Sequence, residues 1–106
     1  MKTQIYKHSV YGWTAESTLE LDLEKDRYLR FVTMKRSSGI STTVSAVVIK
    51  DNIVTMNLFG DYRKELAVTK ARATEKVIGD FHIDNVEKHL VAVLEEATAF
   101  YASKGE

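Results

Sequence analysis

The clearest hydrophobic pattern lies in two strand-like runs, ISTTVSAVVIK and NIVTMNLF, which meet at Asp51-Asn52. Both runs are rich in Val, Ile, Thr and Phe, whose branched or flat side chains suit a pleated, half-buried surface. Asp and Asn tolerate the left-handed backbone angles that a tight turn requires. The pattern therefore predicts a β-hairpin over Ile40–Phe59.

Three earlier stretches also show strand-like alternation. Thr3–Val10 alternates without a clean apolar face, which is typical of an edge strand. Residues 17–24 alternate strictly, with leucines at every second position between acidic and polar residues. We therefore expect a strand with one buried, dry face and one solvent-exposed face. Arg27–Arg36 predicts a further strand. Gly12 permits a bend that would fold Trp13 over the sheet as a core cap.

Polar breaks separate these runs at nearly even intervals. They fall near residues 25, 38, 51 and 61, and Gly39 can supply the positive φ that a turn needs. After the last break, an extended run goes from Arg63 towards Thr74. This spacing, with no helix-length pattern between the breaks, predicts an antiparallel β-meander of four to six strands.

The last part of the chain changes to a helical period. Asp84, three residues before Glu87, resembles a capping box, and Gly105 is placed to end a helix. We therefore predict one C-terminal amphipathic helix from about Asn85 to Ser103. Its apolar stripe is wide and consists of Val86, Leu90, Val91, Val93, Leu94, Ala97, Phe100 and Tyr101.

Residues 75–83 fit two descriptions. Their alternate apolar residues suit a strand, whereas Ile78 and Phe81 nearly continue the helical stripe. Gly79 disfavours a helix by about 1 kcal/mol relative to alanine. We predict a short strand or an irregular link here, and a helix that starts at Thr74 is the alternative.

These elements predict a single α+β domain over residues 1–106, with the helix packed on the sheet or at a dimer interface. At 106 residues and 44% hydrophobic content, the chain has enough material for one core. The helical stripe is wider than one small sheet is expected to cover, so we expect a homodimer. No cysteine is present, and no run of 18 apolar residues occurs, so we expect a cytoplasmic protein without a disulfide or a membrane segment.

Charge is distributed unevenly, although the formal net charge is zero. Residues 27–76 carry ten basic and four acidic side chains, a net charge of +6, which the two flanks balance with −6. If residues 68–76 are extended, alternate side chains project from one face about 6.6 to 6.8 Å apart. That row, Lys70, Arg72, Thr74 and Lys76, would match the backbone spacing of an extended nucleic acid strand.

Basic strands with interleaved aromatic residues are typical of proteins that bind single-stranded nucleic acid with little sequence preference. We therefore predict a small non-enzymatic protein of this class. Its phosphate contacts would be Lys35, Arg36, Arg63, Lys64, Lys70, Arg72 and Lys76, and its stacking rings Tyr28 and Tyr62. Two alternatives remain: the basic residues are solvated faces that protect sheet edges, or the protein is an interaction module, such as a small inhibitor or adaptor, that uses the acidic helix or a sheet edge.

The order of elements resembles that of PC4-type and Whirly-type single-stranded-DNA-binding proteins. In those families a curved antiparallel sheet and a C-terminal helix form dimers that grip the strand across the sheets. The resemblance covers element order only, and it implies a dimeric DNA-binding protein. A PH-like sandwich would suit the same order and would imply a protein or lipid-headgroup ligand.

The remaining candidate chemistry is weaker. In an extended chain Asp80, His82 and Asp84 would share one face, with His89 nearby, and these are metal-ligating residue types. Because aspartate also caps helices for backbone reasons alone, we predict no metal site. The chain has no nucleophile elbow of the G-x-S-x-G kind and no glycine-rich phosphate loop, so we expect neither enzymatic activity nor a cofactor.

Overall fold

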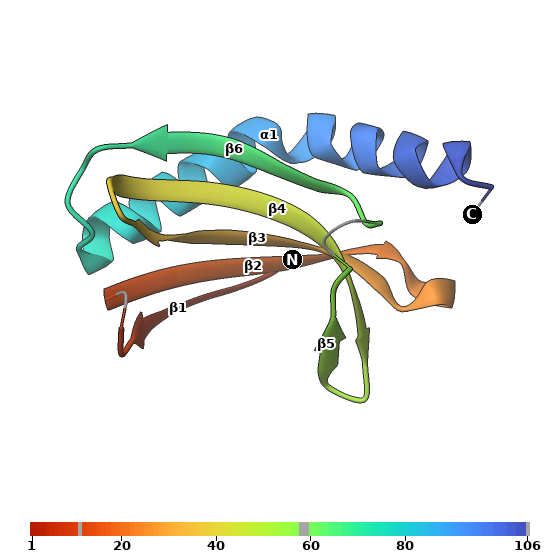
Figure 1. The fold of residues 1–106 in the computed structure, drawn as a ribbon, viewed down its shortest axis with the longest axis horizontal. Helices are drawn as coiled ribbons and strands as arrows, with labels where there is room; N and C mark the ends of the chain where they lie inside the picture. Colours follow the sequence, from red (N-terminus) through yellow and green to blue (C-terminus); the bar gives the residue numbers. More distant parts are fainter. Residues whose placement is uncertain (11, 58–59, 106) are drawn as a thin grey trace.

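The computed structural model describes residues 1–10, 12–57 and 60–105. Within them, six strands form one antiparallel sheet and one long helix follows (Figure 1). The elements are β1 (Lys2–His8), β2 (Gly12–Asp22), the 3-10 turn η1 (Leu23–Lys25), β3 (Arg27–Arg36), β4 (Gly39–Lys50), β5 (Ile53–Thr55), β6 (Arg63–Thr69) and α1 (Glu75–Ser103). The predicted α+β architecture, a β-meander followed by one C-terminal helix, is confirmed.

The sheet order is β1-β2-β3-β4, and both β5 and β6 lie along the far side of β4. The predicted hairpin turn is present, since Asp51 and Asn52 have φ angles of 52° and 63°, as a type I′ turn requires. Its second arm is shorter than predicted, because β5 has only three residues. Leu58 and Phe59 lie outside the described residues. Figure 1 shows the tip of this hairpin projecting away from α1.

The first three strands follow the alternation of the sequence closely. β1 is an edge strand, and β3 has the predicted bounds. Leu23 was expected on the dry face of β2, but it lies in η1 and is 57% exposed. The strand stops because an Asp22 carboxylate oxygen accepts a hydrogen bond from the backbone N–H of Glu24 (3.2 Å), which starts the 3-10 turn. Trp13 packs against the core as predicted.

The predicted start of the helix is wrong. α1 begins at Glu75, and the Thr74 hydroxyl caps it by accepting a hydrogen bond from the backbone N–H of Val77 (3.2 Å). The interval 75–83 is therefore helical, as in the alternative description, and Asp84 and Glu87 lie inside the helix instead of at its start. The predicted end is confirmed, because Gly105 has a φ of 75° directly after the last turn.

Tertiary contacts explain the longer helix. Ile78 and His82 have no exposed surface, so the first turns of α1 bury side chains that a link would leave in water. Burial of this size exceeds the helix penalty of the glycine at position 79, which is about 1 kcal/mol. Gly79 also lets the helix approach the edge of the sheet, since a Cβ atom there would lie 3.1 Å from Ile5 Cδ1.

The core lies between α1 and one face of the sheet. Its main cluster combines side chains of β3 and β4 with those of the helix and consists of Leu29, Phe31, Val44, Ala46, Tyr62, Val86, Val93, Ala97 and Tyr101. Of the eight stripe residues, only Val91 is exposed, at 68%. The chain's own sheet thus covers the stripe and removes our reason for expecting a dimer, and the oligomeric state stays a prediction. No described helix is long and apolar enough to cross a membrane.

Candidate ligand-binding surface

The row of basic residues predicted at positions 68–76 does not form. β6 ends at Thr69, and the chain turns there, with the Thr69 hydroxyl accepting from the backbone N–H of Ala71 (3.4 Å). Lys70 and Arg72 are exposed in the link to the helix. Lys76 lies in the first turn of α1 and pairs with Asp80 (2.7 Å). The prediction failed because Thr74 is the N-cap of α1 and residues 75 and 76 belong to the helix, so the strand cannot extend to residue 76.

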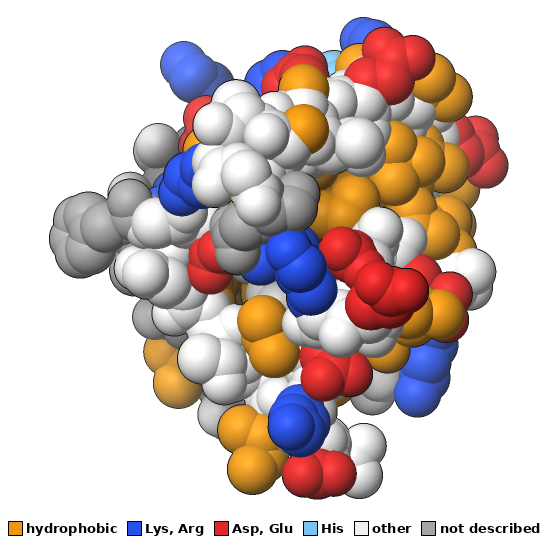
Figure 2. Space-filling view, turned by 90° about the vertical axis from the view of Figure 1, so that its right-hand side faces the viewer, with side chains coloured by type: hydrophobic (Ala, Val, Ile, Leu, Met, Phe, Trp, Pro, Cys, Tyr) orange, Lys and Arg blue, Asp and Glu red, His pale blue; other side chains and the backbone are white. Residues whose placement is uncertain are grey.

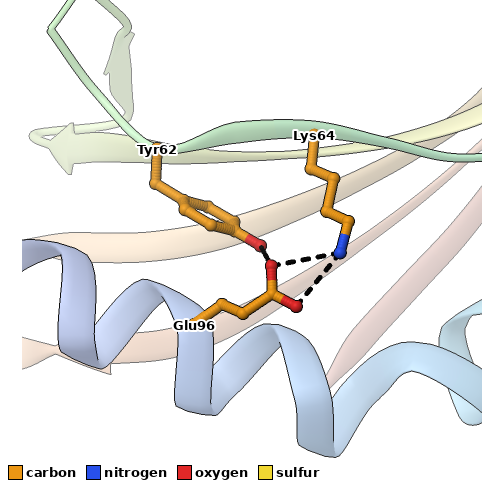
Figure 3. Close-up of polar contacts among 3 residues, drawn as sticks. All are labelled: Tyr62, Lys64 and Glu96. Carbon is orange, nitrogen blue, oxygen red and sulfur yellow. Dashed lines mark hydrogen bonds and ion pairs between the residues drawn. The ribbon is translucent and has the colours of Figure 1, made fainter.

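Two further predicted residues, Tyr62 and Lys64, contact α1. Lys64 Nζ contacts both carboxylate oxygens of Glu96, at 3.1 and 3.0 Å, and the Tyr62 hydroxyl donates to Glu96 Oε1 at 3.0 Å (Figure 3). The Tyr62 ring is only 8% exposed and packs edge-on against Phe100. Burial and the Glu96 hydrogen bond raise the pKa of Tyr62 to about 12. This ring is therefore part of the core and cannot stack on a base.

The sheet face opposite α1 carries Arg30, Arg36 and Arg63. Strand register places Arg30, Ser45 and Arg63 in one row across β3, β4 and β6. Because neighbouring strands lie about 4.7 to 4.9 Å apart, the two arginine Cα atoms are separated by about 10 Å. Arg36 and Tyr28 are an even number of residues from Arg30 along β3, so they share its face.

A shallow depression brings three of the predicted residues together. Its volume is about 450 Å³, and its lining includes Arg36, Arg63 and Lys64 together with Thr43 and Glu65. Lys35 is exposed near the end of β3, on the other side of that strand from Arg36. Of the seven predicted phosphate contacts, the structure thus groups Arg36 and Arg63 on the open face, while Lys64 borders the depression with its ammonium on Glu96 and the others are scattered.

The arginines of this face differ in their partners. Arg30 Nη2 pairs with Glu16, which also accepts a hydrogen bond from the Tyr6 hydroxyl (2.9 Å). Arg36 Nη2 lies 3.9 Å from a Glu65 carboxylate oxygen, so that pair is loose. Arg63 is exposed and makes no ion pair within residues 1–10, 12–57 and 60–105. Of the arginines on this face, Arg63 is therefore the most available to an anion.

Two hydroxyl groups are buried on this same face without a partner. Thr14 Oγ1 and Ser41 Oγ make no hydrogen bond in the described chain, and their residues are 3% and 1% exposed. Thr14 on β2 and Ser41 on β4 are the two cross-strand neighbours of Met34 on β3. A buried unsatisfied polar group costs about 1–3 kcal/mol, so these two positions weaken the sheet locally.

A buried polar network, which the sequence did not reveal, crosses the core. His82 Nε2 is 2.7 Å from Ser17 Oγ, and His82 Nδ1 is 2.8 Å from Thr33 Oγ1, which in turn contacts Thr42 Oγ1 at 2.6 Å. The serine–histidine pair has the composition of a hydrolytic pair, but Ser17 is 1% exposed and His82 is fully buried, so no substrate reaches it. Burial lowers the pKa of His82 to about 4. The network is a structural link between α1 and the strands.

The structure also bears on the metal alternative. Because residues 80–84 are helical, Asp80, His82 and Asp84 do not share one face, and the His82 ring is engaged in the core. Among the residues that the structure describes, no group of three or more His, Asp or Glu side chains is arranged to hold a metal ion.

No protein-family model, curated protein or solved structure matches this chain.

Proposed function

We propose that the protein binds single-stranded nucleic acid, with little sequence preference, on the sheet face opposite α1. The observation that supports this most is the depression whose lining includes Arg36 and Arg63, beside the row that joins Arg30 to Arg63 through Ser45. Guanidinium groups bind phosphate through several directed N–H donors, and a row of them on an open sheet suits an extended strand.

The ion pairs of this face leave donors for phosphate. A guanidinium has five N–H donors. In each of the Arg30 and Arg36 ion pairs the glutamate contacts one guanidinium nitrogen, Nη2. Arg63 is unpaired in the described chain and would make the first contact. The Thr43 and Ser45 hydroxyls lie between the arginine strands and add neutral donors.

The geometry favours a strand that crosses the sheet over one that follows a single β-strand. The arginines of the row are about 10 Å apart, which is more than one nucleotide repeat, so they would hold phosphates that are not adjacent. Tyr28 lies on the same face beyond Arg30 and would offer a half-buried ring to one base. Three or four phosphate contacts correspond to a slope of about −2 to −3 in a plot of log affinity against log salt.

The test is fluorescence anisotropy of a labelled oligo-dT titrated with the protein at low and at high salt. Wild type is compared with Arg63→Glu and Arg36→Glu, and with Lys88→Glu, which makes the same change of charge on the exposed side of α1. We expect binding that weakens with salt, a loss of at least tenfold in the two arginine variants, and a smaller loss in Lys88→Glu. Equal losses in all three variants would show only a general charge effect, and no binding at low salt would refute the proposal.

A further inference from the structure

β2 extends beyond its neighbour on the outer side of the sheet. β1 pairs with β2 from Lys2 opposite Thr18 to His8 opposite Gly12, whereas β2 continues through Asp22. Residues 19–22 therefore have β3 on one side and, in the described part of the chain, no strand on the other. About half of the backbone N–H and C=O groups in such a stretch point to the open side. We call this open edge, residues 19–22, the β2 notch.

Apolar surface borders the β2 notch on the helix side. Leu21 and Thr98 line one small cavity, which places this side of α1 beside the end of β2. Val91, two helical turns before Thr98, lies on the same side of the helix and is 68% exposed. Figure 2 views this end of the molecule and shows hydrophobic side chains gathered beside acidic ones. On the other sheet face the notch opens into a cleft of about 690 Å³, with Tyr28 and Ile49 in its lining.

Acidic side chains outnumber basic ones around the β2 notch, where Lys2 lines the cleft and Lys88 lies three residues before Val91. Glu20 belongs to the notch and Glu24 follows it in η1, and both are exposed. On α1, the exposed Glu87 and Glu95 lie four residues before and after Val91, so they flank it on one side of the helix. A polyanion would be repelled here, whereas a cationic segment would be attracted.

We propose that the β2 notch binds an extended, cationic segment of a partner protein, which adds to the sheet as a short strand in line with β1. The unpaired backbone of residues 19–22 would supply main-chain hydrogen bonds over a length of about 14 Å. Alternate side chains of the segment would pack on Leu21 and Val91, and its basic residues would face Glu20, Glu87 and Glu95. This surface borders the proposed nucleic acid site, because Tyr28 lines the cleft beside the notch, but the main-chain pairing and the contact with Val91 do not depend on nucleic acid binding.

The probe is a synthetic peptide of alternating lysine and valine, six residues long and blocked at both ends. Amide shifts of isotope-labelled protein are followed by NMR as the peptide is added, and the dissociation constant is measured by titration. We expect the largest shifts at residues 19–22 and at Val91. A peptide of the same length with glutamate in place of lysine tests the charge, and one with N-methylated alternate amides tests the backbone pairing. Both should bind at least tenfold more weakly.

Two variants test whether the peptide binds at the β2 notch. Val91→Gln should weaken binding of the lysine–valine peptide at least tenfold, because it replaces an apolar side chain that is 68% exposed in the structure with a neutral polar one. Val68→Gln is the matched control, since Val68 is 56% exposed but lies on β6 at the opposite edge of the sheet, and it should bind the peptide as wild type does. Equal affinity for the lysine and glutamate peptides, largest shifts at residues other than 19–22 and Val91, or no binding at millimolar peptide would overturn the proposal.

Discussion

The buried His82 predicts a loss of stability in mild acid. Its pKa is lowered from 6.5 to about 4 in the folded protein, because the ring has no exposed surface. Above pH 6.5 the ring is neutral in both states, so it contributes no pH dependence. Between pH 6.5 and 4 the unfolded chain takes up a proton that the folded chain does not, and the free energy of unfolding falls. The loss is complete below about pH 4.

The size of this effect follows from the shift in pKa. One pKa unit corresponds to about 1.4 kcal/mol, so the fall from 6.5 to about 4 is worth roughly 3 kcal/mol. A domain of this size has a total stability of about 5–15 kcal/mol, so His82 alone would remove a substantial part of it. Glu16 acts in the opposite direction, because its carboxylate favours the charged imidazole.

The assay is urea unfolding, followed by circular dichroism, at several values between pH 7 and 4. In His82→Gln the amide can still hydrogen-bond with Ser17 and Thr33, but no proton is taken up at this site. We expect this variant to be less stable than wild type at pH 7. Between pH 6.5 and 4 its free energy of unfolding should fall by roughly 3 kcal/mol less than that of wild type. His8→Gln is the control for loss of a histidine outside the core. Parallel pH profiles of wild type and His82→Gln would show that His82 does not cause the loss of stability, as would titration of the His82 ring near pH 6.5 in an NMR experiment.

Three further substitutions test the packing. Thr14→Val removes a buried hydroxyl that has no partner, so thermal unfolding should show a gain of about 1 kcal/mol; a loss would mean that the hydroxyl is satisfied. Gly39→Ala should cost at least about 2 kcal/mol, because φ is 121° and a Cβ atom would lie 2.1 Å from the Thr69 carbonyl oxygen. Wild-type stability in that variant would contradict the turn geometry. Glu96→Gln should lower the pKa of Tyr62 below about 12, read by NMR of labelled tyrosine, but burial should keep it above 10; an unchanged pKa would exclude the hydrogen bond.

The strands were predictable because their signals are local. The alternation of residue types predicted both ends of β3 correctly, and the Asp51-Asn52 pair marked a turn with two positive φ angles. The start of α1 was not predictable in this way. Local propensity at Gly79 argued against a helix, whereas the burial of Ile78 that favours one depends on contacts with distant strands.

The candidate surface was predictable in composition but not in layout. The excess of basic residues can be counted, yet the face on which each lies depends on strand register. The register between β4 and β6 shifts between Thr42 and Thr43, and this irregularity directs Lys64 to the helix and Arg63 to the open face. No sequence signal marked the contact of His82 with Ser17, because the two residues are 65 positions apart.

The most direct test of the proposed function is to map the nucleic acid site by NMR, by adding oligo-dT to isotope-labelled protein at low salt. We expect shifts confined to the open face of β3, β4 and β6, centred on Arg30, Ser45 and Arg63, and their disappearance when salt is raised. We also expect no change at Val91, on the helix side of the β2 notch. Shifts on the exposed side of α1, or no shifts at all at low salt, would contradict the proposed function.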